Sequence, residues 1–377
     1  MILISRNDNS LISRWWLTLD HWNVIQILSL AVIGTLIIFA AGSGVALNKG
    51  YEELFFFKNH IKYMVIALLC MFFASFFSKT GIVRFGVFGF VASIVLLVLV
   101  MFYGPDINGA TRWLRFGMFS IQPSEFMKPF FVITTAMLFS KDYKNNYKIF
   151  NYLSPNIISA ILLFLVVLLL LKQPDLGMSI IVVSIWTGQL FLAGLSLRWV
   201  ILMFGFLIVG ILLGYNIFDH VKERIDCFVN VNCKGMEQIT NSFKAYESGG
   251  LIGKGPGSGI IKNYIPDAHT DFIFPVIAEE FGAIFCIIIL LLCCSIVLRG
   301  FIKIRNKNDL FSLLTVGGML SLFGVQVLLN VSVTLGLVPT TGVTFPFISY
   351  GGSSLVSASI SMGVVLALTK KSNEIEN

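Results

Sequence analysis

Three carboxylates stand at the start of, and inside, one long apolar run. Residues 269–280 read His-Thr-Asp-Phe-Ile-Phe-Pro-Val-Ile-Ala-Glu-Glu, with acids at Asp271, Glu279 and Glu280. A charge in hydrocarbon costs roughly 2.5–3.5 kcal/mol on insertion scales, so an ionisable residue there indicates a functional site. Apolar neighbours would partly desolvate Asp271 and raise its pKa, which suits a general base. In a helix that starts at Asp271, Glu279 would lie on the same face as Asp271 and could support the site. Glu280 would point in roughly the opposite direction and pair with another residue.

A second group of polar residues lies between 108 and 128. Glu125 and Lys128 are three residues apart, so a helix would bring them onto one face, where they can pair. This pair is either a structural anchor at a helix end or a cation and a carboxylate facing a polar cavity. Arg112 beside Trp113 fits either a grip on an anionic headgroup or an aromatic anchor at the membrane interface.

Three further places in the sequence add polar groups or a Gly-rich backbone. Asp175 follows Gln-Pro at a helix start and is expected to be an N-cap, a site residue or both. The Gly-rich stretch 248–259 lacks the context of a P-loop. It is either a linker or a backbone nest for a diphosphate, with Lys254 or Lys262 nearby. His269 is expected to be a polar-rim residue or a participant in the chemistry.

The segment 330–354 interrupts an apolar region with Pro339, Pro346 and several Gly. Non-helical backbone at membrane depth is tolerated only where protein buries it or water reaches it. We therefore expect this segment to line a cavity, where hydroxyls such as that of Ser349 can bind a polar headgroup.

The elements that must position these residues are membrane helices. The chain has 377 residues, of which 56% are hydrophobic and 12% are charged, whereas soluble domains carry about 25% charged residues. Apolar runs of about 20 residues span a bilayer, and the sequence predicts an all-α polytopic membrane protein with about ten transmembrane helices. Their ranges are 23–45, 60–78, 84–103, 123–140, 154–171, 176–194, 198–216, 275–298, 310–335 and 353–369.

Charge in the short loops predicts the orientation. Lys and Arg concentrate in the loops that share a side with the two termini, so both termini are expected to be cytoplasmic. The large loop 217–274, between the seventh and eighth helices, then lies outside, together with the polar groups described above. The organisation expected is a leader 1–22, a single transmembrane domain 23–369 and a tail 370–377. In the outer loop, Cys227 and Cys233 are either a disulfide or two free thiols.

These motifs together resemble the SEDS family of cell-wall proteins, the FtsW/RodA/SpoVE group. The similarity extends over most of the chain. Its motifs are Ala-Thr-Arg-Trp at 110–113, Gln-Pro-Ser-Glu at 122–125, Lys-Gln-Pro-Asp-Leu-Gly at 172–177, His-Thr-Asp-Phe-Ile-Phe at 269–274 and the segment 330–354. The leader 14–20, the turn 108–110, and residues 339–342 with Ser353 and Ser354 are more similar to the division branch, FtsW, than to the elongation branch.

The resemblance implies an inverting glycosyltransferase that polymerises lipid II, a disaccharide-pentapeptide on undecaprenyl diphosphate, at the outer face of the bacterial cytoplasmic membrane. Asp271 would be the catalytic carboxylate. Arg112, Lys128 or a divalent cation such as Mg²⁺ or Mn²⁺ would stabilise the leaving diphosphate. No fixed cofactor is implied. The substrate-binding residues would be Arg112, Trp113, Glu125, Lys128, Asp175, Lys254, His269 and Ser349.

The expected partners are a class B penicillin-binding transpeptidase similar to FtsI, other division proteins and membrane lipids, at the division septum. Nucleic acid is not expected, because the basic residues are scattered along short loops. Three alternatives stay open: an elongation-type polymerase, a lipid II flippase and a scaffold without activity. The concentration of polar chemistry on the outer side favours a polymerase over a flippase.

Overall fold

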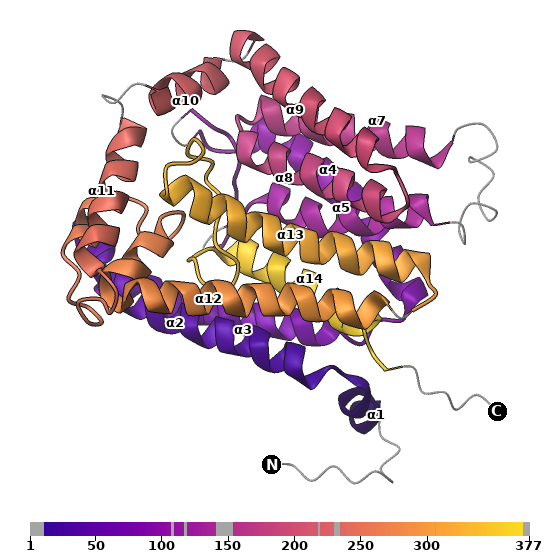
Figure 1. The fold of residues 1–377 in the computed structure, drawn as a ribbon, viewed down its shortest axis with the longest axis horizontal. Helices are drawn as coiled ribbons and strands as arrows, with labels where there is room; N and C mark the ends of the chain where they lie inside the picture. Colours follow the sequence, from indigo (N-terminus) through magenta and orange to yellow (C-terminus); the bar gives the residue numbers. More distant parts are fainter. Residues whose placement is uncertain are drawn as a thin grey trace.

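The computed structural model describes residues 11–106, 109–116, 119–140, 154–217, 219–229, 234–305 and 307–371. Helices make up most of this part of the chain (Figure 1). The helices are α1 (Leu11–Thr18), α2 (His21–Asn48), α3 (Phe55–Ala74), α4 (Lys79–Tyr103), α5 (Pro123–Phe139), α7 (Pro155–Lys172), α8 (Leu176–Leu192), α9 (Leu197–Ile217), α10 (Asp219–Val229), α11 (Lys234–Gly249), η2 (Ile261–Tyr264), α12 (Ile273–Arg305), α13 (Leu310–Thr334) and α14 (Gly352–Leu368).

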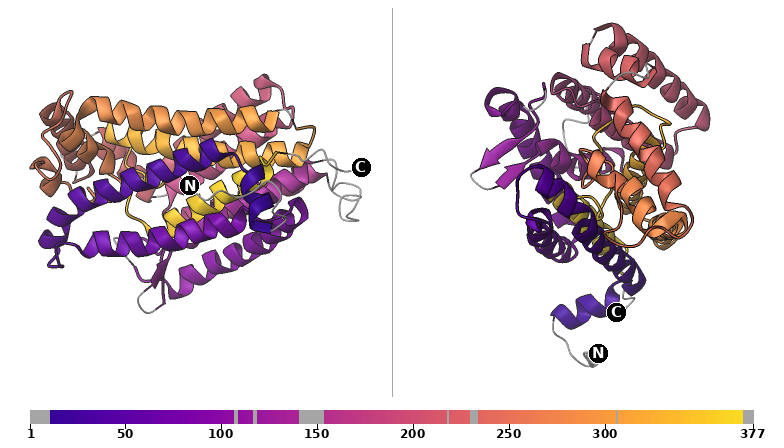
Figure 2. Two further views of the ribbon diagram at one scale, coloured as in Figure 1. Left: turned by 90° about the horizontal axis from the view of Figure 1, so that it is seen from below. Right: turned by 90° about the vertical axis from the view of Figure 1, so that its left-hand side faces the viewer.

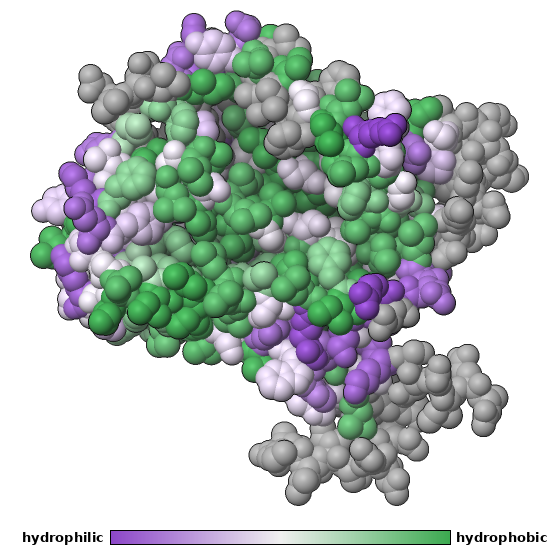
Figure 3. Space-filling model, in the orientation of Figure 1, coloured by the Kyte–Doolittle hydropathy of each residue, from purple (hydrophilic) through white to green (hydrophobic). Residues whose placement is uncertain are grey.

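Each of the ten predicted membrane ranges is occupied by a helix. Among the described residues, six helices are long and apolar enough to cross a membrane, namely α2, α3, α4, α7, α12 and α13. The long helices lie roughly side by side in a bundle (Figures 1 and 2). Hydrophobic side chains cover most of its flank, and hydrophilic ones gather toward the two ends (Figure 3).

The structure differs from the sequence prediction outside the membrane ranges. The outer segment 217–274, predicted as a loop, contains α10, α11 and η2, and the leader contains α1. The all-α prediction missed one hairpin, in which β1 (Leu114–Phe116) pairs antiparallel with β2 (Phe119–Ile121). The hairpin is too short for the alternating pattern from which strands are recognised. Cys233 lies outside the described residues, so the disulfide prediction stays untested.

Two apolar clusters hold the bundle together. One joins α2, α3, α12 and α14, and the other joins α4, α5, α7, α8 and α13. Helices α4 and α5 approach closely because Gly86 and Gly89 present no side chain: a Cβ at these positions would lie 2.3 Å from Ile133 and 2.7 Å from Phe130. Small residues permit such contact in membrane bundles, where packing rather than water exclusion drives association.

The start of α12 is locked to the Gly-rich loop. Gly282 has a φ of 81° and interrupts the helix, and the amides of Ala283 and Ile284 donate to the carbonyls of Gly250 and Leu251. The Glu279 carboxylate accepts from the amides of residues 260–262 at 2.8–3.0 Å. Glu279 therefore holds the loop.

The buried Lys262 ammonium lies 2.5 Å from Glu280 and also donates to the carbonyl of Ala40. Glu280 thus pairs away from Asp271, as predicted. The ion pair ties η2 to both α12 and α2.

Candidate active site

Asp271 lies in a turn before α12 rather than in its first turn, because the helix begins at Ile273. The turn is closed by the amides of Thr270 and Phe272, which donate to the carbonyl of Asp267 at 3.0 and 3.2 Å. The buried amide of Asn330 on α13 donates to the backbone carbonyls of Asp271 at 2.9 Å and Val343 at 2.7 Å. The Asp271 backbone is therefore fixed from α13, while its carboxylate stays free to face a cavity.

Burial and a neighbouring acid both favour the protonated form of Asp271. Its surroundings raise the pKa of Asp271 to about 7, first through desolvation and then through the charge of Asp267. The Arg112 guanidinium acts in the opposite direction. Part of the Asp271 surface remains accessible from the cavities beside it. A carboxyl group with a pKa near neutrality is matched to proton transfer at physiological pH.

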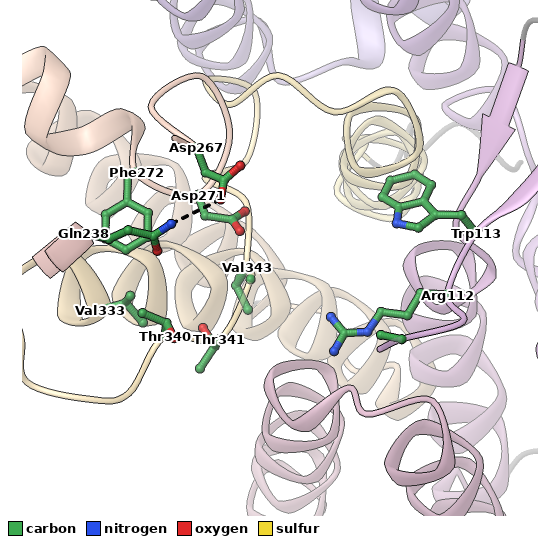
Figure 4. Close-up of a pocket in the computed structure, with 12 residues that line it drawn as sticks. Arg112, Trp113, Gln238, Asp267, Asp271, Phe272, Val333, Thr340, Thr341 and Val343 are labelled. Carbon is green, nitrogen blue, oxygen red and sulfur yellow. Dashed lines mark hydrogen bonds between the residues drawn. The ribbon is translucent and has the colours of Figure 1, made fainter. Parts of the chain in front are cut away.

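Arg112 faces Asp271 from the opposite wall (Figure 4). It precedes β1 and donates from Nε to the carbonyl of Gln173 at 3.1 Å and from Nη2 to the carbonyl of Pro174. Its Nη1 lies 3.9 Å from Oδ1 of Asp175. The carbonyls and the carboxylate hold the guanidinium in place.

Asp175 has the predicted N-cap role, since its side chain accepts from the amide of Met178 at the start of α8. Its Oδ1 also lies near Arg112, but Asp175 lines neither cavity described below, so it contacts the site through Arg112 alone. A direct role in substrate binding stays a prediction.

Glu125 and Lys128 form the pair that their spacing predicts. The ammonium lies 2.7 Å from Oε2 of Glu125, and the side chains of Lys128 and Glu125 are 0% and 3% exposed, respectively. Glu125 lines a cavity, whereas Lys128 does not line either cavity described below and lies behind the carboxylate. The pair therefore presents its acidic member to the site.

Two cavities meet at Asp271. One, of about 390 Å³, extends toward Gln238, Asp267, Thr340 and Thr341. The other, of about 330 Å³, extends toward Tyr63, Gln122, Glu125 and the segment 350–354. Both are lined by Arg112, Trp113, Asp271 and Gly342.

Gly342 stands between the two charged groups. Its φ is 73°, and a Cβ there would lie 3.7 Å from the Asp271 carboxylate and 3.9 Å from the Arg112 guanidinium. The segment 330–354 lines both cavities, as predicted.

Of the other predicted substrate-binding residues, His269 lines a cavity and Lys254 does not. His269 lines the second cavity and is mostly buried against Phe56, with ring centroids 4.2 Å apart. Burial, followed by the charge of Lys49, lowers the pKa of His269 to about 3, so the ring is neutral at pH 7. Ser349 is buried and donates to the carbonyl of Thr270 at 2.6 Å. Lys254 is exposed on the Gly-rich loop and lines neither cavity.

Sequence reasoning missed three residues that shape the site: Asp267, Gln238 and Asn330. Asp267 precedes Asp271 by four residues, and this spacing was available as a signal for a second acid in one turn. Gln238 comes from α11 and lies 3.5 Å from the Asp267 carboxylate. Asn330 contacts Asp271, which is 59 residues away in the sequence. No local sequence pattern predicts this contact.

Known proteins are similar in sequence to this chain over nearly its whole length. The sequence profile of the cell cycle protein family FtsW/RodA/SpoVE matches residues 21–374. The probable peptidoglycan glycosyltransferase FtsW of Caulobacter vibrioides is 35% identical over 97% of this chain and 93% of its own length. Stage V sporulation protein E of Bacillus subtilis is 32% identical over 93% of this chain and 96% of its own length.

Solved structures show the same fold. One chain, from a study of how a peptidoglycan synthase complex coordinates polymerization and crosslinking, superposes with a TM-score of 0.76 at 26% identity. It covers 94% of this chain and 98% of its own. The rod shape determining protein RodA of Thermus thermophilus has a TM-score of 0.69 at 26% identity, over 94% and 97% of the two chains. The chain is thus a polytopic membrane protein, and it belongs to the FtsW/RodA/SpoVE family of cell cycle proteins.

Proposed function

We propose that this chain is a peptidoglycan glycosyltransferase that polymerises lipid II during cell division. The observation that carries the proposal is the meeting of two cavities at one carboxylate and one guanidinium, Asp271 and Arg112. A polymerase must bring two large substrates together, the end of a growing strand and the next building block. Two cavities sharing a general base supply that geometry. The names of the relatives supply the substrate class.

In the proposed reaction, Asp271 accepts the proton of the acceptor sugar hydroxyl while that oxygen attacks the anomeric carbon of the donor. The bond from that carbon to the diphosphate oxygen breaks, the configuration inverts, and the electron pair leaves with the diphosphate. Stabilising this charge is a large part of such catalysis. Of the two predicted protein cations, Arg112 lines both cavities and Lys128 lines neither, which favours Arg112.

A divalent cation remains the alternative source of positive charge. Among the described residues, no group of three or more His, Cys, Asp or Glu side chains forms a metal site. Asp267 and Asp271 line one cavity, and Mg²⁺ is often held by one or two carboxylates together with substrate phosphates. These two acids therefore fit a cation that arrives with the diphosphate. Synthesis in EDTA, with and without added Mg²⁺ or Mn²⁺, distinguishes it from Arg112 acting alone.

We further propose that both termini are cytoplasmic, that Asp271 faces outward, and that the protein works at the septum with a class B penicillin-binding transpeptidase and other division proteins. One of the similar structures comes from a complex that joins polymerization to crosslinking, which supports a crosslinking partner. Residues 23–369 would form one transmembrane domain, between the leader and the tail.

The deciding experiment supplies lipid II to the purified protein, alone and with its transpeptidase partner. Wild type is expected to make glycan chains, and Asp271→Asn, which has nearly the same shape but cannot accept the proton, is expected to make none. Normal synthesis by this variant would remove Asp271 from the mechanism. Scrambling of lipid II across liposomes without polymer would instead indicate a flippase, and unchanged growth of cells carrying only Asp271→Asn would indicate a scaffold.

A further inference from the structure

A separate polar cavity lies at the other end of α12, and the proposed reaction does not use it. It measures about 220 Å³ and is lined by residues of α2, of the end of α12 and of the chain that follows α14. Asp271 precedes α12, whereas Arg299 and Lys303 of this cavity lie in its last two turns. At 1.5 Å per residue this separation is roughly 45 Å, so the two sites lie at opposite ends of the bundle (Figure 1).

The described residues that line the cavity carry more positive than negative charge. Arg299 donates from Nε and Nη2 to the two oxygens of Asp20 at 2.8 and 2.6 Å, so this pair neutralises itself. Lys303 and Lys371 also line the cavity, and neither ammonium lies within 4 Å of a carboxylate oxygen among the described residues. The charge of Asp20 is therefore balanced by Arg299, and the two lysines add positive charge around the cavity.

The walls of the cavity are held by contacts that do not involve the ammonium groups of these lysines. The Asp20–Arg299 pair joins the N-cap of α2 to α12. The backbone amide of Lys371 donates to the carbonyl of Thr18 at 2.9 Å, which fixes the end of the described chain against α1. Trp15 of α1 donates to Ser75 at 2.8 Å and anchors that helix on the bundle. The cavity is thus a formed feature, and two lysines are among the residues that line it.

One side of the cavity continues into surface that suits hydrocarbon. Trp22 lines the cavity and is 63% exposed. Leu298 and Ile302, each one residue before a basic residue of α12, are also more than half exposed. Hydrophilic side chains border the hydrophobic flank at this end of the molecule (Figure 3). A ligand that fits has an anionic head for the cavity and apolar chains for the flank, with the indole at headgroup level.

We propose that this cavity binds the phosphate of an anionic phospholipid, with Lys303 and Lys371 contacting the phosphate and the acyl chains lying along α2 and α12. Basic pockets between membrane helices on the cytoplasmic side are suited to such headgroups. Soluble phosphate would satisfy the lysines but would leave the adjoining apolar surface unused. The site does not depend on the reaction proposed for Asp271.

The test measures lipid binding to the purified full chain in detergent by native mass spectrometry. Wild type is expected to retain phosphatidylglycerol in preference to zwitterionic phosphatidylcholine, more strongly at low salt. Each lysine near an anionic headgroup is expected to contribute about fivefold in affinity. The double variant Lys303→Gln/Lys371→Gln should therefore bind phosphatidylglycerol about 25-fold more weakly. The matched control Arg198→Gln/Arg305→Gln removes the same charge from exposed residues that do not line the cavity, and it should bind like wild type.

Several outcomes would overturn the proposal. Equal retention of both lipids by wild type, or equal loss in both double variants, would show only general attraction to a basic surface. Displacement of the lipid by glycerol phosphate at equal concentration would show a phosphate site rather than a lipid site. A stronger preference for a polyprenyl diphosphate would point to the substrate instead. Repeating the titration with Glu374→Gln/Glu376→Gln removes these two carboxylates as competitors without placing a chain end on Lys371. Thermal unfolding curves verify that each variant is folded.

Discussion

The protonation of Asp271 sets the pH range in which the proposed enzyme can work. Its environment raises the pKa of Asp271 to about 7, and a general base is active only when deprotonated. The rate should therefore be at its plateau above pH 7 and should fall about tenfold per unit as the pH drops below the pKa. Initial rates of glycan synthesis between about pH 5.5 and 8.5 measure this decrease at low pH, the acid limb of the pH profile.

Asp267 provides the matched variant for this prediction. Its negative charge is the second cause of the raised pKa of Asp271, so Asp267→Asn should lower that pKa. The acid limb should then move to lower pH, while the plateau changes less than the limb. A limb that stays in place in Asp267→Asn, or that moves to higher pH, would contradict the assignment of this limb to Asp271.

Asn330 is expected to act on the reaction through the position of Asp271. Asn330→Asp keeps the shape of the side chain but loses the amide donor, and even a protonated carboxyl can bond only one of the carbonyls of Asp271 and Val343. The turn at Asp271 and the segment around Val343 should shift. Because a small displacement of a catalytic group lowers the reaction rate strongly, kcat should fall about tenfold or more, with a smaller change in KM. Steady-state kinetics on lipid II measures both constants.

Thr334→Val is the control for Asn330 on the same helix. It removes a buried hydroxyl that bonds Tyr246 and the carbonyl of Val331, one turn beyond Asn330. Each such bond contributes about 0.5–1.5 kcal/mol to stability, so both variants should unfold at lower temperature. Only Asn330→Asp should also lose kcat. If the two variants lose activity in proportion to their loss of stability, Asn330 has a structural role alone.

At the scale of elements, the break in α12 depends on close backbone contact with the Gly-rich loop. Gly253 has a φ of 85°, and a Cβ there would lie 2.3 Å from the carbonyl oxygen of Glu280. Gly253→Ala should push the loop away from α12 and cost several kcal/mol of stability, because backbone cannot move aside as a flexible side chain can. Thermal unfolding of the purified protein in detergent measures the loss.

Gly250→Ala separates this clash from simple backbone strain. Gly250 also has a positive φ, of 54°, but a Cβ there would meet nothing within 4 Å. This variant should lose only about 1 kcal/mol, the usual difference between Ala and Gly in a left-handed conformation. Similar losses in the two variants would mean that the contact with the broken helix contributes little.

The same elements show what the sequence can predict. The membrane helices can be located because a run of about 20 apolar residues matches the thickness of the hydrocarbon core. The role of Glu279 was predicted incorrectly, because the stripe argument assumed that the helix included Asp271, whereas α12 begins at Ile273. Contacts such as Asn330 with Asp271 depend on tertiary packing between distant elements. Local spacing therefore found Asp271, Arg112 and Glu125 but missed Asp267 and the polar residues that position the site.

Across the whole molecule, the two ends of α12 differ in charge. Just before α12, Asp267 and Asp271 line a cavity, while the other end of the helix gathers Arg299, Lys303 and, from the chain after α14, Lys371. Basic residues stay on the cytoplasmic side of membrane proteins. The division of charge therefore predicts which way the bundle faces, and the proposed function requires that Asp271 face outward, where lipid II is polymerised.

Cysteine labelling in intact cells tests this orientation. In a chain with Cys227 and Cys233 replaced by Ser, Ile252→Cys places a thiol on the exposed Gly-rich loop, where the native side chain is 82% exposed. Lys371→Cys places one at the basic end, at an exposed residue. A maleimide that cannot cross membranes should label the first in intact cells and the second only after permeabilisation. The reverse pattern would put Asp271 on the cytoplasmic side, and polymerisation of lipid II at the outer face would then be excluded whatever the geometry of the site.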